Sequence, residues 1–195
     1  MNPNSTSTIS SAKRTFSTKE LVLGGMFAAI LAAISQISLP MPTGVPITIQ
    51  VFGVALTGVV LGWRLGLFAT ITYILLGAVG LPIFSNFRGG LGVLTGVTGG
   101  YIWAWPFLTV LSGISFKGKK PAVTIFLTVL SALLGLAIVE IAGGLQWAAL
   151  AGDKSVGAVF AYSIVAFIPK DIIITILAVF IGLPMRRRIM EHSFR

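Results

Sequence analysis

Residues 21–39 read LVLGGMFAAILAAISQISL, an apolar stretch without a single charged residue. Because a helix of about 20 apolar residues crosses the roughly 30 Å hydrocarbon core of a bilayer, this stretch predicts a membrane-spanning helix. The whole chain agrees, since 55% of its 195 residues are hydrophobic and only 10% are charged. Soluble domains contain about 25% charged residues on average. The sequence therefore predicts an integral membrane protein.

Further apolar segments follow the first. We expect membrane helices at 47–62, 65–80, 93–114, 122–142 and 169–184. These segments are continuously apolar and do not alternate between apolar and polar residues, which favours helices over barrel strands. Because proline is favoured in the first turn of a helix, we start the last span near Pro169 and expect 156–167 to form a short outer helix. The predicted fold is all-α, with six transmembrane helices.

The positions of the basic residues test this number of spans. With six spans, eleven of them lie on the side of the two termini, namely Lys13, Arg14, Lys19, Arg64, Lys117, Lys119, Lys120, Arg186, Arg187, Arg188 and Arg195. The opposite side carries only Arg88 and Lys154, and Lys170 falls within the last apolar stretch. Since cytoplasmic loops are enriched in Lys and Arg, we expect a cell-membrane protein with both termini in the cytoplasm. Topology thus explains the net charge of +9, and nucleic acid is not an expected partner.

The chain divides into one membrane domain and two tails. We expect residues 1–18, rich in Ser, Thr and Asn, to be a disordered cytoplasmic tail, 19–185 to form the six-helix domain, and 186–195 to be a basic cytoplasmic tail. A cleaved signal peptide is the competing interpretation of the N-terminal region. We favour a permanent helix, because 21–39 is long enough to span the membrane and the charge balance requires it.

Several kinds of chemistry are excluded by composition. The chain has no Cys, five acidic residues and one His, so we expect no disulfide, no metal site and no resident cofactor. The G-x-x-x-x-G-K-[ST] motif of P-loop ATPases is absent from the sequence. We therefore expect a non-enzymatic protein that hydrolyses no ATP itself.

Polar residues on the outer side are the candidates for a binding site. Gln50 lies near the start of the second span, where it faces either a ligand or a neighbouring helix. The glycine-rich segment 80–92 predicts a re-entrant or ordered loop between the third and fourth spans. Within this loop, Arg88 suits a carboxylate and Asn86 offers both a donor and an acceptor. The alternative for Arg88 is a surface position at the level of the lipid head groups.

Other candidates lie in the last three spans. Asp171, in the first turn of the last helix, is either a ligand-binding group or a structural partner of Lys170 or Arg88. The Tyr101 hydroxyl needs a partner when it is buried. Trp147 is favoured as a pocket residue, whereas Trp103 and Trp105 are expected to be interface anchors. For Glu140, a cavity-lining role, a proton site and an interface position all remain open.

The spacing Gly92-x-x-x-Gly96-x-x-x-Gly100 predicts three glycines on one helix face, where close packing against a neighbouring helix is expected.

Several segments resemble the BioY family, the biotin-specific S components of energy-coupling factor (ECF) transporters. They are 45–50 (VPITIQ), 80–101 (GLPIFSNFRGGLGVLTGVTGGY) and 167–171 (FIPKD). The resemblance implies a six-helix membrane protein that binds biotin from the outside. It also implies three partners, namely a membrane scaffold (T) component and two cytoplasmic ATP-binding cassette ATPases.

The resemblance and the polarity of the residues together give an expected binding site. The ureido ring of biotin is expected to meet Asp171, Asn86 and Gln50. Its apolar part suits Phe84, Tyr101 and Trp147. Its carboxylate suits Arg88 or Lys170. Lys170 or Asn86 donating to the ureido carbonyl is a further arrangement. The chain departs from the family's Pro-Gly-Asp-x-x-Lys pattern, because Lys170 replaces the glycine and Ile174 replaces the lysine.

Small residues in the first helix match the family's A-x-x-x-A motif for docking on the scaffold. Two registers fit, Ala28 with Ala32 and Ala29 with Ala33, and packing within the protein is the alternative for each. Two functions of other kinds are also considered, a proton-coupled carrier for a small carboxylate and a membrane assembly factor. An S component for a different vitamin is the remaining alternative.

Overall fold

The computed structural model describes residues 16–116, 118–152 and 155–193, and most of these are helical. The elements are α1 (Thr18–Ser35), β1 (Ser38–Leu39), β2 (Ile47–Thr48), α2 (Gln50–Ala78), η1 (Ser85–Phe87), α3 (Leu91–Thr95), α4 (Gly99–Ser112), α5 (Pro121–Leu150), α6 (Val156–Ala166) and α7 (Ile168–Ser193). Four of the described helices, α1, α2, α5 and α7, are long and apolar enough to cross a membrane. Most of the predicted N-terminal tail lies outside the described residues.

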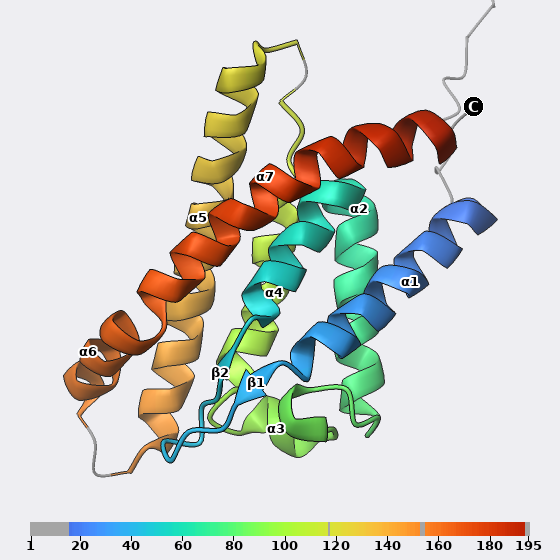
Figure 1. Ribbon diagram of the computed structural model, residues 1–195. Helices are drawn as coiled ribbons and strands as arrows, with labels where there is room; N and C mark the ends of the chain where they lie inside the picture. The colour runs from blue at the N-terminus through green and yellow to red at the C-terminus, as the bar shows by residue number, and fades with distance from the viewer. Residues whose placement is uncertain (1–15, 117, 153–154, 194–195) are drawn as a thin grey trace, which may run out of the picture.

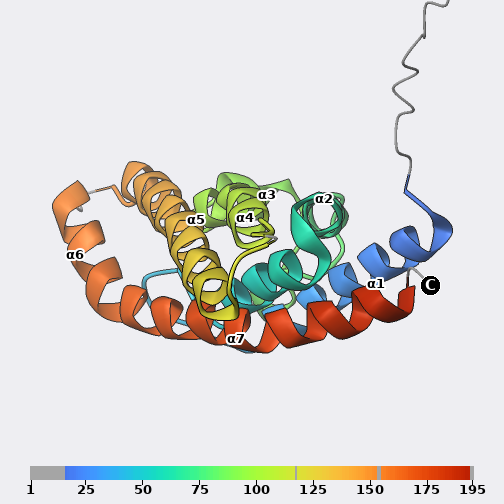
Figure 2. The same ribbon diagram turned by 90° about the horizontal axis from the view of Figure 1, so that it is seen from above.

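Helix α2 is bent into two arms that run in opposite directions (Figure 1). The reversal occurs at Gly62, whose φ of 78° and ψ of 167° are not helical and suit a residue without a Cβ. The arms correspond to the two expected spans 47–62 and 65–80. Helix α4 lies between α2 and α5, and α7 crosses both of these neighbours (Figure 2).

The expected fourth span, 93–114, is wrong in one respect, because the chain breaks into α3 and α4. Gly96 has an extended backbone with ψ of −174°, so Gly92, Gly96 and Gly100 do not share one helix face. Of the three, only Gly100 packs closely on a neighbouring helix, against the Ala142 carbonyl of α5. The break is stabilised by the Gln146 amide of α5, which donates to the carbonyl oxygens of Leu94 and Gly96 at 3.1 and 2.8 Å.

The two alanine pairs of helix α1 lie on different faces, with Ala28 and Ala32 toward the core and Ala29 and Ala33 on the exposed side. Ala28 is 4% exposed and packs into the core, where the half-buried Ala32 joins it. Ala29 and Ala33 are exposed, and a Cβ on the preceding Gly25 would meet nothing within 4 Å. The expectation that Ala28 offers a docking surface is therefore wrong, because that face of α1 is already covered by α2.

Helix α7 continues past the expected end at Pro184 to Ser193. Arg186 extends toward the ends of two other helices, with its Nη1 3.4 Å from the Val59 carbonyl oxygen and 3.5 Å from that of Gly113. The start of the expected 186–195 tail is thus a helical continuation that packs on the bundle.

Basic residues gather at one end of the bundle. Lys19 lies in the first turn of α1, Arg64 follows the bend of α2, Lys120 precedes α5 and Arg186–Arg188 lie near the C-terminal end of α7. These four places lie at the same end of the molecule, opposite β1, β2 and α3 (Figure 1). Lys13, Arg14, Lys117, Lys154 and Arg195 lie outside the described residues.

The close packing of α2 on α4 gives a test of this arrangement. A Cβ added at Gly58 would clash with the backbone carbonyl of Thr109 and the hydroxyl of Ser112. We expect Gly58→Ala to lower the free energy of unfolding by about 1–3 kcal/mol, the usual cost of overpacking, and to lower the thermal midpoint of the purified protein in detergent. Gly25→Ala is the matched control, since its site is open and only the higher helix propensity of alanine acts there, so it should not lower the midpoint. Equal midpoints for the two variants would contradict this packing.

Candidate functional site

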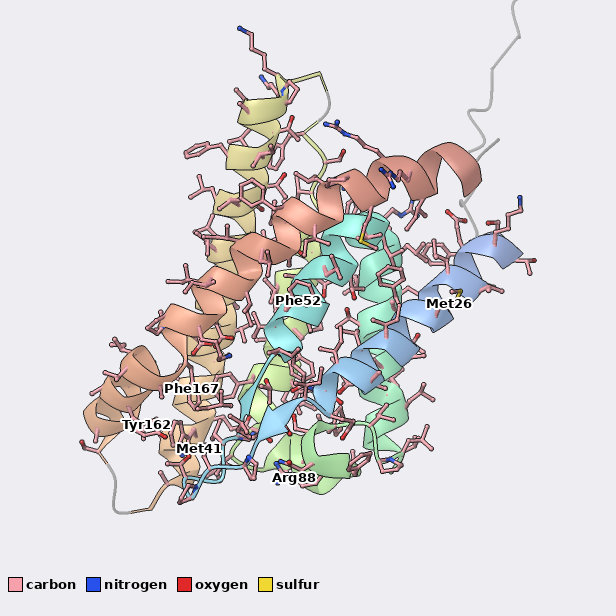
Figure 3. The ribbon with its side chains drawn as sticks, in the orientation of Figure 1. Met26, Met41, Phe52, Arg88, Tyr162 and Phe167 are labelled. Carbon is pink, nitrogen blue, oxygen red and sulfur yellow. The ribbon has the colours of Figure 1, made fainter. Side chains whose placement is uncertain are left out.

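A cavity lies at the end of the bundle opposite Lys19, Arg64, Lys120 and Arg186–Arg188, between β2, the loop after α2, and helices α4, α5 and α7. Its volume, including the open mouth, is about 620 Å³. Figure 3 shows that Arg88 and Phe167 lie toward this end of the molecule, away from Met26 on the outer face of α1.

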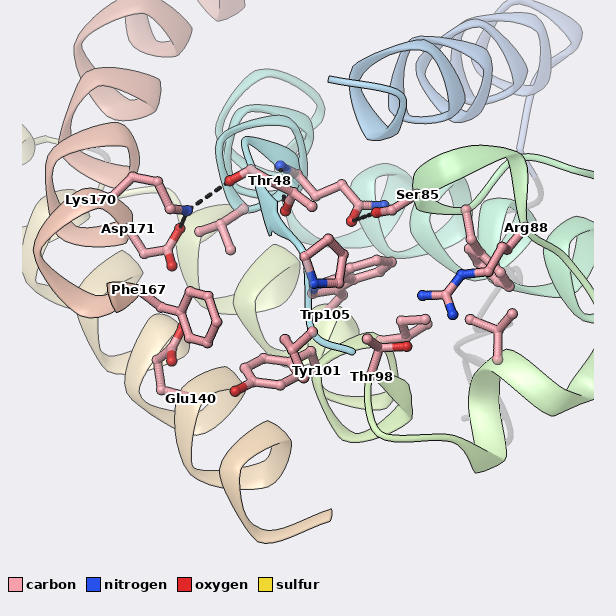
Figure 4. Close-up of a pocket in the computed structure, with 17 residues that line it drawn as sticks. Thr48, Ser85, Arg88, Thr98, Tyr101, Trp105, Glu140, Phe167, Lys170 and Asp171 are labelled. Carbon is pink, nitrogen blue, oxygen red and sulfur yellow. Dashed lines mark hydrogen bonds and ion pairs between the residues drawn. The ribbon is translucent and has the colours of Figure 1, made fainter. Parts of the chain in front are cut away.

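The apolar walls are aromatic. Tyr101 and Trp105, one turn apart on α4, line one side, and Phe167 lines another (Figure 4). Phe84 is 1% exposed and meets the Tyr73 ring edge-on at 5.6 Å. A Cβ at Gly77 would overlap the Phe84 ring, so this glycine lets the loop after α2 pack against the helix that precedes it.

A hydrogen-bonded chain supports the wall beside β2. The Gln50 amide donates to the Tyr73 hydroxyl at 3.0 Å and accepts from the Ser85 hydroxyl at 2.9 Å. Tyr73 in turn donates to the Ile83 carbonyl oxygen at 2.9 Å. Since the Gln50 amide carries a second N–H and a second lone pair, it holds the loop in place and still has capacity to bind a ligand.

A buried ion pair lies at the start of α7. The Lys170 ammonium group donates to the Asp171 carboxylate and, at 2.7 Å, to the Thr48 carbonyl oxygen of β2. The Asp171 side chain is 4% exposed and that of Lys170 is 26% exposed. Both possibilities raised for Asp171 are therefore compatible, because it pairs with Lys170 and also lines the cavity.

Arg88 lines the mouth of the cavity, with its guanidinium group directed inward (Figure 4). Its backbone carbonyl accepts from the Phe84 N–H at 2.9 Å, which closes the loop around η1. Its side chain makes no hydrogen bond or ion pair with the described residues. The backbone bond fixes the loop that carries Arg88, and the exposed guanidinium group is available to bind an anion.

Two of the expected site residues lie outside the cavity lining. Asn86 is exposed, has a φ of 59° and accepts a hydrogen bond from the Ser38 hydroxyl at 3.0 Å, so it connects the loop to β1. Trp147 is 2% exposed and packs edge-on against Tyr162 and at 6.2 Å from the Phe167 ring. Trp147 therefore lies behind the wall that Phe167 forms.

The structure adds residues that the sequence analysis missed. Trp105 is 4% exposed and lines the cavity, so its assignment as an interface anchor is wrong. Its spacing of four residues from Tyr101 is the signal that places both on one helix face. Ser85, Thr48 and Phe167 also line the cavity, and so does Glu140, whose role the sequence left open. Within the described ranges, no group of three His, Cys, Asp or Glu side chains suits a metal ion.

A family model gives this site its context. The model described as the BioY family matches residues 6–191. The chain belongs to the BioY family. It is 37% identical over 164 residues to a probable biotin transporter BioY of Pyrococcus horikoshii, covering 84% of this chain and 94% of the relative. It is 36% identical over 174 residues to the biotin transporter BioY of Rhizobium etli, covering 85% and 92%.

The fold also matches a solved structure, the crystal structure of the S-component for biotin from an ECF-type ABC transporter. The TM-score is 0.76 at 26% sequence identity, and the match covers 89% of this chain and 95% of the other. The multi-helix membrane architecture expected from the sequence is therefore confirmed as that of an ECF S component.

The ion pair at the start of α7 yields a prediction for the protein without ligand. Lys170→Met leaves the Asp171 carboxylate buried without a cation, so we expect a loss of stability of about 3 kcal/mol. The double variant Lys170→Met/Asp171→Leu removes both charges and should recover most of the thermal midpoint. Lys119→Met, at an exposed position on the opposite end, is the control. If Lys170→Met behaves like that control, the pair does not stabilise the fold.

Proposed function

We propose that this protein is the biotin-binding S component of an ATP-driven ECF transporter and captures biotin from the outer side of the membrane. The observation that carries the proposal is the cavity itself. It combines aromatic walls, a buried Lys170–Asp171 pair and an unpaired Arg88 guanidinium in a chain of the BioY family. These features match the three parts of biotin, an apolar thioether ring, a polar ureido ring and a carboxylate.

The arrangement of charges supports one orientation of the ligand. Arg88, at the mouth, binds the valerate carboxylate through the paired donors of its guanidinium group. The ureido ring then lies deeper, near Asp171, Lys170 and Gln50, with Phe84 and Tyr101 beside the thioether ring. Asn86 and Trp147 act indirectly, Asn86 by holding the loop to β1 and Trp147 by supporting Phe167.

Lys170 takes the cationic role of the lysine that the family pattern has at position 174. Ile174 packs against the hydrophobic core, whereas Lys170 lines the cavity. The Thr48 carbonyl fixes the ammonium group beside Asp171. The cation is therefore supplied from the residue before the aspartate instead of the one three positions after it.

The proposed topology has six crossings, one each by α1, the two arms of α2, α4, α5 and α7, with α6 and the loop 79–98 on the outer side. The basic end of the bundle then faces the cytoplasm, as does each terminus, and the cavity opens outward from the cell membrane. The loop forms an ordered cover for the cavity, because its own Phe84 and Ser85 side chains are buried.

Transport requires an energy source from other proteins. The proposed partners are a transmembrane scaffold (T) component and two cytoplasmic ATP-binding cassette ATPases, with biotin as the substrate and no resident cofactor. The stripe of Gly25, Ala29 and Ala33 on α1 offers the scaffold a surface without bulky side chains, and small residues allow two helix backbones to approach closely.

Binding of labelled biotin to the purified protein tests the proposed function. We expect saturable binding, and we expect Arg88→Ala to weaken it by about 10- to 100-fold, because a charge-assisted hydrogen bond contributes about 1.5–3 kcal/mol. Arg187→Ala, which removes an exposed arginine at the opposite end, is the control and should bind like the wild type. Absence of saturable binding by the wild type would contradict biotin as the substrate.

Reconstitution in liposomes tests the partners. The protein alone should not accumulate biotin, with or without a pH gradient, and uptake should require the scaffold, the ATPases and ATP. Ala33→Trp should reduce co-purification with the scaffold and uptake while leaving biotin binding intact. Leu134→Trp, on the exposed face of α5, is the control for added bulk. Uphill uptake by the isolated protein would show a secondary carrier instead.

A further inference from the structure

Two polar atoms in the cavity region are buried and make no hydrogen bond with the described residues. They are Oε2 of Glu140 and the hydroxyl of Tyr101. Glu140 is 7% exposed, and both side chains line the cavity from neighbouring helices, α5 and α4 (Figure 4). The binding mode described above assigns no partner to Glu140.

The two side chains are brought together by the packing of α4 on α5. Gly143 lies three residues after Glu140 on α5, and a Cβ there would overlap the Tyr101 ring. The ring therefore rests on the α5 backbone, beside the Glu140 carboxyl. Phe167 approaches Tyr101 edge-on at 6.5 Å and lines the same cavity beside this corner.

The polar groups around Glu140 do not supply a hydrogen-bond donor to its Oε2 atom. The Lys170 ammonium group is already engaged by Asp171 and by the Thr48 carbonyl oxygen. Asp171 is itself acidic and repels a second carboxylate. The buried Ser163 hydroxyl of α6 lies beside Tyr101, and no interaction of Ser163 with Glu140 is found among the described residues. A buried acceptor left in this state costs more free energy than a normal hydrogen bond returns, and ionisable residues at membrane depth are costly unless they serve a site.

A ligand N–H group is the partner that this corner lacks. A carboxylate oxygen accepts such a bond, and the Tyr101 hydroxyl either donates or accepts beside it. A ureido ring carries two N–H donors on either side of one carbonyl, so it offers one donor to Asp171 and a second in another direction. The aromatic rings around this corner exclude water and strengthen the bond.

We propose that Glu140 and Tyr101 form a second polar subsite, in which Glu140 Oε2 accepts a hydrogen bond from one ureido N–H of the bound ligand. This inference rests on the proposed function, because it assumes biotin as the ligand. It makes Glu140 a specificity-determining residue that selects a nitrogen-bearing ring over an isosteric ring with oxygen at the same place.

Equilibrium competition against labelled biotin tests the subsite in the purified full-length protein. The ligands are biotin and its two cyclic carbamate analogues, each with one ureido N–H replaced by a ring oxygen. We expect Glu140→Gln to bind biotin about fivefold to tenfold more weakly than the wild type, because the glutamine oxygen still accepts the N–H but carries no charge. For the carbamate with oxygen facing position 140, Glu140→Gln should bind as well as the wild type or better, because the glutamine amide donates to that oxygen. Tyr101→Phe should weaken biotin binding by about threefold to tenfold.

Two controls separate this role from a structural one. Glu20→Gln, in the exposed capping box of α1, makes the same chemical change away from the cavity and should bind like the wild type. The thermal midpoint of ligand-free Glu140→Gln should equal or exceed that of the wild type, because an unpaired buried carboxylate has been removed.

Each outcome has a distinct meaning. Biotin affinity of Glu140→Gln within twofold of the wild type would overturn the subsite, and so would an equal loss for biotin and both carbamates. A fall in the ligand-free midpoint together with such an equal loss would assign Glu140 a folding role. If the wild type itself shows no saturable biotin binding, the proposed function fails, and the subsite fails with it.

Discussion

The close approach of α4 to its two neighbours is the constraint on which the rest of the structure depends. Lipid tails are as apolar as leucine, so helices in a bilayer associate through backbone packing more than through burial of apolar surface. Gly58 lets α2 reach the Thr109 carbonyl, and a Cβ at Gly135 of α5 would lie 2.8 Å from the Cα of Leu108. Gly143 does the same for Tyr101 at the other end of α4. The position of α4 between α2 and α5 then sets the aromatic wall of the cavity, because Tyr101 and Trp105 project from it.

The polar groups divide into those that hold the cavity in shape and those left for a ligand. Gln50, Tyr73 and Ser85 bond to one another and to the loop after α2, so they fix the wall beside β2. Glu140 Oε2 and the Arg88 guanidinium group make no hydrogen bond with the described part of the chain. A protein that binds from water into a membrane benefits from this division, because the pre-formed wall lowers the entropy lost on binding.

Hydropathy and charge predict the helices well, because both properties are averages over many residues. The 156–167 helix and the start of α7 near Pro169 also follow from local rules, in this case the preference of proline for a first helical turn. The break between α3 and α4 does not follow, since Gly96 is apolar and its extended backbone depends on Gln146, fifty positions further along the chain. Contacts between residues far apart in the sequence also decide which tryptophan lines the cavity. Trp105 and Trp147 are both buried, and only the packing of α4, α6 and α7 determines which of them lines the cavity.

The two cations near the cavity differ in what they offer to an anion. Lys170 already neutralises Asp171 and donates to Thr48, so turning it toward a ligand leaves a carboxylate that is 4% exposed without its counter-ion. The Arg88 guanidinium group has no acidic partner among the described residues. Two opposite unit charges about 4 Å apart attract each other by roughly 4 kcal/mol at the effective dielectric constant of a protein surface, so Arg88 offers this attraction to an anion. In the proposed binding mode, the anionic end of the ligand therefore lies at the mouth, beside Arg88. This mode leaves the neutral ring, with its donors, for the acidic side chains farther in, and both charges of the ion pair stay compensated when the site is filled.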